Sequence, residues 1–242
     1  MSPEKASPGF FGPHENIYVY VPNLIGYGRV VCYGFSLAVA FSQPELCLFL
    51  YFLGFFGDLL DGKAARALGQ SSTYGAVLDM VSDRMATTAF LFVLSHLYKE
   101  YWWVFILLSI LDLASHWYAM YSSLIEKRKS HKGESKSGLF LVNFYYSHYW
   151  FFAYCCVGAE VLYLALYLLT VPKYQHWPAL PIDGAFMVPV LGDAAAGPLS
   201  LASVVALLCL PGCLTKQIVN VFQLLSSAAV IAEYDRRQMK NN

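Results

Sequence analysis

The sequence predicts an all-α fold, a polytopic membrane helix bundle with six transmembrane helices. Of its 242 residues, 57% are hydrophobic and only 13% are charged, and the mean hydropathy is +0.48. Soluble domains carry roughly 45–50% apolar and about 25% charged residues, so a soluble domain and a disordered chain are both excluded. Six mainly apolar stretches each have about the 20 residues that cross a bilayer. They are 20–42, 45–66, 75–98, 101–124, 147–171 and 200–233.

Polar segments separate these stretches in order. The first four breaks are rich in charged or small polar residues, and they are 42–45, 67–74, 99–100 and 126–137. Residues 172–199 hold five of the 11 prolines and three glycines, which predicts an irregular loop. Pro211–Gly212 predicts a kink in the last stretch, or a short interfacial piece followed by a span.

The expected organisation is one six-helix domain over 17–235, with a mobile cytosolic tail at 1–16 and a second tail at 236–242. Residues 1–16 are polar, and we expect no signal peptide there. With the N-terminus in the cytosol, the cytosolic segments hold eleven Lys and Arg, and the far side holds only Lys99 and Lys173. Basic loops stay cytosolic, so both termini and the loops after the second and fourth stretches are predicted to face the cytosol.

Charge and cysteine usage exclude two other classes of protein. The 16 basic and 16 acidic residues balance, so no nucleic-acid partner is expected. The six cysteines lie in or beside apolar runs, and none forms a CxxC pair. A zinc site and a disulfide framework are therefore not expected.

Four aspartates surround one predicted cytosolic turn. Asp58 and Asp61 end the second stretch, and Asp79 and Asp83 begin the third. Ionisable residues within spans are costly and mark functional sites. The acids and nearby small residues fall at the same helical spacing in both stretches, which places them on one face of each helix. A short loop makes the two helices antiparallel neighbours, so we expect the two faces to meet near the cytosolic surface.

Four carboxylates so close together need protons or cations. Ligand sets made only of oxygen favour hard ions such as Mg²⁺, Mn²⁺ or Ca²⁺, and four acids can hold two ions, as in phosphoryl-transfer sites. On spacing alone, a proton-sharing carboxylate cluster of a transporter remains the alternative.

The pattern of residues from 58 to 83 carries a family resemblance. Eight residues stand at the spacing of one signature: Asp58, Asp61, Gly62, Ala65, Arg66, Gly75, Asp79 and Asp83. This segment resembles the signature of the CDP-alcohol phosphatidyltransferase family. Further segments, Glu15–Ile17, Val21–Tyr27 with Arg29, Leu111–Trp117 and Ser130–Lys132, look like the eukaryotic phosphatidylinositol synthase branch. The likeness covers 15–171 and, more weakly, 200–235.

The resemblance implies a reaction and a set of roles. CDP-diacylglycerol and myo-inositol would give phosphatidylinositol and CMP, with two Mg²⁺ or Mn²⁺ ions. It implies Asp58, Asp61, Asp79 and Asp83 as metal ligands, with Asp83 also the general base. CDP-diacylglycerol would be bound by Gly62, Ala65, Arg66, Ser72, Asn23 and Arg29. The residues proposed for the acceptor are His116, Lys132 and Lys216. It also implies a homodimer among membrane lipids of the endoplasmic reticulum, with the Golgi as the alternative.

Two alternatives remain at this point. The first keeps the fold and chemistry but uses another alcohol, namely serine, glycerol phosphate, phosphatidylglycerol or inositol phosphate. A phosphorylated acceptor would want a basic pocket near Asp83, and Arg84 and Lys216 are too few to make one, so neutral inositol is favoured. The second is a cation-coupled transporter, which is disfavoured because the acids lie at one face and no internal repeat is visible.

Overall fold

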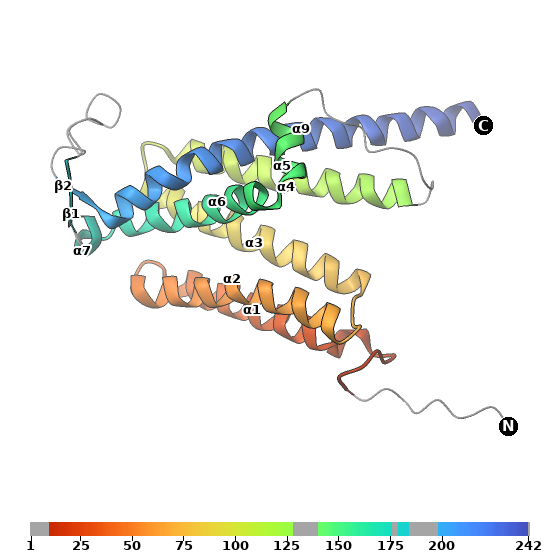
Figure 1. The fold of residues 1–242 in the computed structure, drawn as a ribbon, viewed down its shortest axis with the longest axis horizontal. Helices are drawn as coiled ribbons and strands as arrows, with labels where there is room; N and C mark the ends of the chain where they lie inside the picture. The colour runs from red at the N-terminus through yellow and green to blue at the C-terminus, as the bar shows by residue number, and fades with distance from the viewer. Residues whose placement is uncertain (1–9, 128–139, 176–178, 184–197, 242) are drawn as a thin grey trace. The chain divides into compact units, whose positions relative to one another are not determined.

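A computed structural model describes residues 10–127, 140–175, 179–183 and 198–241 of the chain (Figure 1). The described part divides into two compact units, a first unit up to Val93 and a second unit from Leu94 onward. Each unit has its own helices and its own packing.

The first unit is built from η1 (Ile17–Val19), α1 (Val21–Val39), α2 (Pro44–Ala67) and most of α3 (Thr73–Leu97). Prolines lie in the first turns of α1 and α2, where the missing N–H costs no hydrogen bond. Gly69, with a φ of 62°, follows the end of α2, a conformation that favours glycine. The Ser72 hydroxyl accepts the Gly75 N–H at 3.0 Å and so caps the start of α3.

Helices α1 and α2 lie side by side and pack closely through glycines (Figure 1). A Cβ atom at Gly54 would lie 2.7 Å from Cε1 of Tyr33, so only glycine allows this approach. The Tyr33 ring packs edge-on against Tyr51 with centroids 5.2 Å apart. The buried Ser36 hydroxyl donates to the Cys47 carbonyl at 2.7 Å. These contacts fix the two helices against each other in the part of α2 that precedes its aspartates.

The second unit is organised around its longest helix. Helices α4 and α6 both pack against α9. The Tyr98 hydroxyl, in the turn before α4, donates to the Leu166 carbonyl at 2.8 Å. The elements of this unit are α4 (Trp102–Lys127), α5 (Phe140–Ser147), α6 (Tyr149–Leu169), α7 (Pro172–Gln175), β1 (Ala179–Asp183), β2 (Pro198–Ser200) and α9 (Leu201–Asn241).

Helix α9 runs for 41 residues with Pro211 inside it, as one helix rather than a short piece followed by a span. Proline interrupts the backbone hydrogen bonds of a helix, and neighbouring helices can satisfy the freed groups. The Tyr154 hydroxyl of α6 donates to the carbonyl of Leu208, three residues before Pro211, at 2.7 Å. Gly212 leaves room for that ring, because a Cβ there would lie 3.0 Å from Cε1 of Tyr154.

All six predicted apolar stretches are helical, as α1, α2, α3, α4, α6 and α9. Within the described residues, three segments are long and apolar enough to cross a membrane: Trp102–Ile125, Tyr149–Leu169 and Leu201–Lys240. The helices α1, α2 and α3 are not in this set, since they carry the polar residues of the site described below. The all-α prediction needs one correction. Part of the predicted loop 172–199 forms an antiparallel pair of strands, in which Ala179 lies opposite Ser200.

We predict that Gly54→Val lowers the melting temperature of the purified protein. The larger side chain must push α1 and α2 apart at Tyr33, and overpacking of this kind costs about 1–3 kcal/mol. Gly28→Ala is the matched control, because a Cβ atom at Gly28 meets nothing within 4 Å. It should keep or slightly raise the melting temperature. Equal melting temperatures for Gly54→Val and wild type would contradict the close packing.

Candidate functional site

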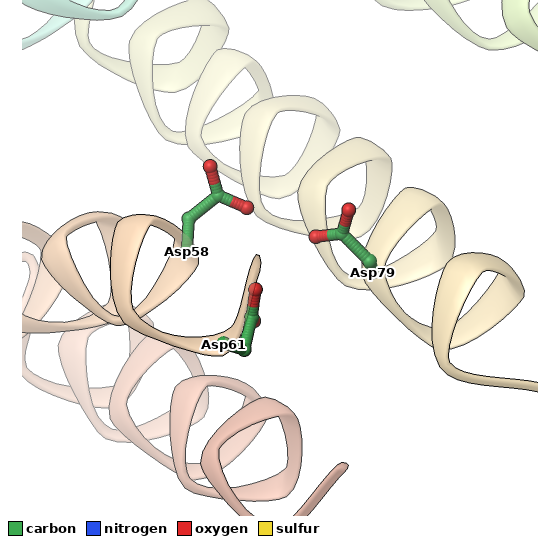
Figure 2. A group of neighbouring side chains, drawn as sticks. All are labelled: Asp58, Asp61 and Asp79. Atoms are coloured by element: carbon green, nitrogen blue, oxygen red, sulfur yellow. The ribbon is translucent and has the colours of Figure 1, made fainter. Parts of the chain in front are cut away.

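The first unit gathers acidic side chains from two helices. Figure 2 shows Asp58 and Asp61 on α2 and Asp79 on α3 with their carboxylates turned toward a shared space. One oxygen atom from each of the three lies within 4.8 Å of the others. The helical spacing explains the grouping, because residues three apart on α2 point the same way. These residues together with Asp83 are called the acid cluster below.

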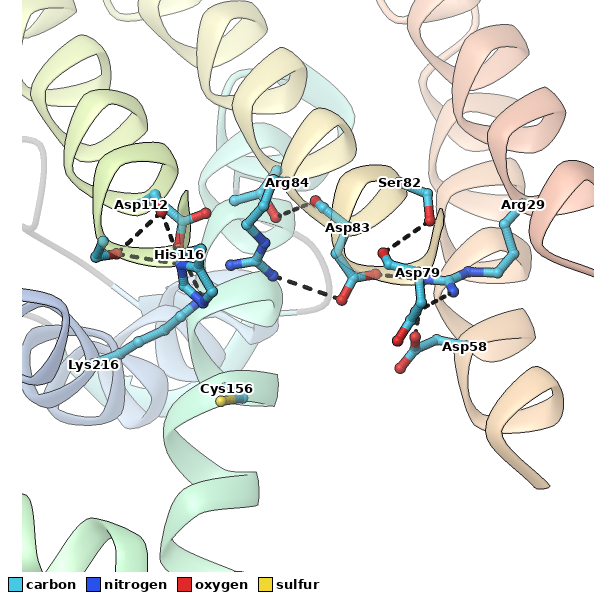
Figure 3. A network of polar contacts seen from close by, with 12 residues as sticks. Arg29, Asp58, Asp79, Ser82, Asp83, Arg84, Asp112, His116, Cys156 and Lys216 are labelled. Atoms are coloured by element: carbon cyan, nitrogen blue, oxygen red, sulfur yellow. Dashed lines mark hydrogen bonds and ion pairs between the residues drawn. The ribbon is translucent and has the colours of Figure 1, made fainter. Parts of the chain in front are cut away.

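Arg29 of α1 lies among these acids (Figure 3). Its Nη1 atom is 2.7 Å from Oδ2 of Asp61 and 2.7 Å from Oδ1 of Asp79. Its Nη2 atom is 2.9 Å from Oδ1 of Asp58 and also contacts Oδ1 of Asp83. Asp83 thus joins the cluster through Arg29, whereas the group of three close oxygens comes from the other acids. The sequence assigned Arg29 to the lipid donor, which stays a prediction, and in the structure Arg29 contacts all four acids.

The acid cluster fits a divalent metal ion. Its donors are carboxylate oxygens, which hard cations such as Mg²⁺ and Mn²⁺ prefer. Its four acids outnumber the two guanidinium groups that contact them, those of Arg29 and Arg84. The side chain of Asp61 is 10% exposed, whereas those of Asp58, Asp79 and Asp83 are 32–48% exposed, so solvent reaches the cluster. Excess negative charge with solvent access is the arrangement that recruits a cation.

A pocket of about 180 Å³ opens beside the acids, within the first unit. Asp61 and Asp79 form part of its wall. Four residues that the sequence assigned to the donor also line it: Asn23, Gly62, Ala65 and Ser72. Gly62 and Ala65, the two of these that lie on α2, have no side chain or a short one, so the backbone of α2 leaves space next to the carboxylates. The Ser72 hydroxyl has a structural task as well, because it caps α3.

Arg66, which the sequence also assigned to the donor, does not line this pocket and is exposed on α2. A Cβ atom at Gly62 would lie 3.5 Å from its Nη1 atom, so the guanidinium folds back over the glycine one turn earlier. A planar guanidinium binds phosphate oxygens in pairs. Arg66 is therefore placed to contact an anionic ligand that enters beside Gly62.

Asn23 and Gly75 meet at the wall of the pocket. Asn23 is 2% exposed, and its Nδ2 atom donates to the Ile17 carbonyl at 2.6 Å. A Cβ atom at Gly75 would lie 2.8 Å from Oδ1 of Asn23. The glycine of the signature thus has a physical reason, since it lets the amide from α1 approach the first turn of α3.

Gln70 is a residue of this site that sequence reasoning missed. It lines the pocket, is 1% exposed, and accepts the Val21 N–H at 2.8 Å. Its Nε2 atom donates to the carbonyls of Phe10 and Gly12 at 2.9 and 3.1 Å. From Phe10 onward the predicted tail 1–16 is therefore held against the turn between α2 and α3, while residues 1–9 lie outside the described part. A glutamine in a polar loop gives no signal of such a role.

The second unit holds a separate polar cluster that includes two of the residues assigned to the acceptor. The Nζ atom of Lys216 and the Nδ1 atom of His116 each lie 3.7 Å from Oδ1 of Asp112 (Figure 3). The Asn220 amide donates to the same oxygen at 3.5 Å. Asp112, Lys216 and Asn220 are all at most 5% exposed. Lys132, the third residue assigned to the acceptor, lies outside the described residues.

Comparison with known proteins adds the family. A family model described as CDP-alcohol phosphatidyltransferase matches residues 19–172. The chain belongs to the CDP-alcohol phosphatidyltransferase family. The matched region of the chain contains Arg29, the acid cluster and the pocket. Helix α9 lies beyond it.

Curated relatives match over nearly the whole chain. CDP-diacylglycerol–inositol 3-phosphatidyltransferase 1 of Arabidopsis thaliana is 40% identical over 91% of this chain and 92% of its own. The CDP-diacylglycerol–inositol 3-phosphatidyltransferase of Schizosaccharomyces pombe is 38% identical over 93% of this chain and 94% of its own. The enzyme of that name from Homo sapiens is 33% identical, over 92% and 96%. No solved structure matches the chain.

We predict that Gln70→Ala frees the segment around Phe10. Three hydrogen bonds are lost at a buried position, each worth about 1 kcal/mol, so the melting temperature should fall. Limited digestion with chymotrypsin should cut faster after Phe10 and Phe11, as followed by mass spectrometry. Ser71→Ala, at an exposed neighbour with one long hydrogen bond of 3.4 Å, is the control. Unchanged cleavage in Gln70→Ala would show that Gln70 does not hold this segment.

Proposed function

We propose that this protein transfers the phosphatidyl group of CDP-diacylglycerol to myo-inositol, giving phosphatidylinositol and CMP. One observation carries the proposal: the acids of α2 and α3 converge beside a pocket whose walls carry the small residues of the family signature. The three relatives described above, each similar over 92–96% of its length, carry the name of this activity.

Asp58, Asp61 and Asp79 would hold the cations, with Asp83 completing the set, and the proposal takes these to be two Mg²⁺ or Mn²⁺ ions. Bound there, they would neutralise the pyrophosphate of the donor and stabilise the leaving CMP. The chain itself supplies the positions of the ligands, because two helices fix the carboxylates. Phosphoryl transfer depends mainly on such positioning and electrostatics.

The donor would lie with its cytidine diphosphate in the pocket. Gly62 and Ala65 leave the space, and Asn23 and Ser72 offer polar atoms in the wall. Arg66 would bind a phosphate oxygen from the exposed side of α2. The pocket thus orients the donor so that its lipid-linked phosphorus faces the acids.

Asp83 would act as the general base. In the transfer, its carboxylate takes the proton of an inositol hydroxyl, the hydroxyl oxygen bonds to the phosphorus, and the bond from that phosphorus to CMP breaks. Asp83 suits this task better than the other acids. It lies outside the group of three close oxygens, and this sets it apart, because its side chain at 32% exposed is no more accessible than those of Asp58 at 35% and Asp79 at 48%.

The proposal includes a membrane setting. Three helices have the length and composition to span a bilayer, and α1, α2 and α3 would complete a set of six. The basic residues of the sequence favour a cytosolic active site with cytosolic termini. A homodimer in the endoplasmic reticulum follows from the family resemblance.

An acceptor assay tests the proposed function. Protein in detergent with CDP-diacylglycerol, Mn²⁺ and labelled myo-inositol should release CMP and form labelled phosphatidylinositol. Serine, glycerol phosphate and inositol phosphate should react far more slowly in parallel reactions. Faster reaction with any of them would overturn the choice of acceptor. Absence of CMP release with every alcohol, in folded protein, would overturn the transferase assignment and favour a transporter.

Asp83→Asn should abolish turnover while the protein still folds and binds Mn²⁺. The amide keeps the size of the side chain and cannot take a proton at neutral pH. Asp58→Asn serves as the comparison, because it removes an oxygen from the close group of three and should weaken Mn²⁺ binding as well. Turnover of Asp83→Asn near the wild-type rate would remove Asp83 from the role of base.

We propose that Lys216 and His116 contact the acceptor, and this can be separated from a structural role. Lys216→Met should lower the melting temperature, because loss of one partner from a buried pair costs about 3–5 kcal/mol. The double variant Asp112→Asn with Lys216→Met should regain most of the stability. In both the single and the double variant, the KM for inositol should be several-fold higher than in wild type, with the KM for CDP-diacylglycerol unchanged. If the double variant regains both the melting temperature and the wild-type KM for inositol, Asp112 and Lys216 form a helix contact only.

A further inference from the structure

Each terminal nitrogen of Arg29 lies between two carboxylates. Nη1 contacts Asp61 and Asp79, and Nη2 contacts Asp58 and Asp83. We propose that Arg29 is an internal counter-cation, which competes with the divalent metal ion for the acid cluster and so sets its affinity. The inference rests on the proposed function only for the identity of that ion.

The packing of α1 against α2 holds the Arg29 side chain at this position. Its side chain is 1% exposed, although a buried charge is costly unless it is paired. A Cβ atom at Gly57 would lie 2.7 Å from Cγ of Arg29, so α2 has no side chain where the arginine passes. Its Nε atom is buried with no hydrogen-bond partner among the described residues. The buried charge is therefore compensated at its terminal nitrogens, by the acids.

Competition follows from charge. The guanidinium contacts Oδ1 of Asp58, Oδ2 of Asp61 and Oδ1 of Asp79, each at 2.7–2.9 Å. A carboxylate oxygen can bind a metal ion and accept a hydrogen bond together, so shared oxygens alone do not exclude the guanidinium. Its positive charge, however, neutralises part of the negative charge that attracts a divalent cation, and like charges this close repel strongly. The guanidinium therefore lowers the affinity of the acid cluster for the ion.

Mn²⁺ titration followed by electron paramagnetic resonance, in detergent and without substrate, tests the inference. Arg29→Gln should bind Mn²⁺ about tenfold more tightly than wild type, equivalent to about 1.4 kcal/mol. Its melting temperature in EDTA should be lower than that of wild type, and Mn²⁺ should raise it by more. Arg84→Gln is the matched control, because Nη2 of Arg84 lies 3.7 Å from Oδ2 of Asp83, farther than Arg29 lies from any of the acids. Its Mn²⁺ affinity should stay within about twofold of wild type.

Weaker or equal Mn²⁺ binding by Arg29→Gln would overturn the inference and make Arg29 a residue that holds the acids in place for the metal. If Arg29→Gln does not fold, Arg29→Lys decides, because one ammonium group cannot lie between both pairs of acids. That variant should bind Mn²⁺ about threefold more tightly, and equal or weaker binding overturns the inference. Failure of wild type to bind Mn²⁺ also overturns it. The CMP-release assay reports separately on the proposed function.

Discussion

The concentration of negative charge on α2 and α3 is the constraint on which the first unit depends. Four carboxylates repel one another in a medium of low dielectric, and they stay together only with opposite charge among them. Arg29 provides part of that charge from α1, and so the electrostatic requirement of the acids also determines where α1 lies. Local packing is consistent with this requirement, because the absence of a side chain at Gly57 leaves room for Arg29 beside α2.

Small residues in the first unit serve three different ends. Gly54 and Gly57 let α1 approach α2, and Gly75 lets Asn23 approach α3. Gly62 and Ala65 instead leave the space of the pocket. A stripe of small residues at helical spacing therefore combines a helix contact with a ligand cavity. Whether a small residue serves a helix contact or the ligand cavity depends on which side chains lie next to it in the fold.

Much of the fold and of the site could be predicted from the sequence, for a clear reason. Apolar length and helical spacing are local properties, so the six helices and the shared face of Asp58 and Asp61 follow from counting residues. The place of Arg29 depends on a helix about 30 residues away along the chain, and no spacing within 58–83 contains it. Gln70 is missed for the same reason. Its partners Phe10, Gly12 and Val21 lie 49–60 residues away along the chain, and no local spacing connects them to Gln70.

The two polar clusters differ in charge balance, and this difference supports their proposed roles. In the first unit four acids exceed the arginines that contact them, which calls for added cations and for an anionic donor bound through those cations. In the second unit the Asp112 carboxylate faces the Lys216 ammonium and the His116 imidazole, with Asn220 beside them. The positive charge of Lys216 is already paired with Asp112, which leaves it less suited to bind a phosphorylated acceptor. This cluster offers hydrogen bonds to a neutral alcohol, as inositol requires.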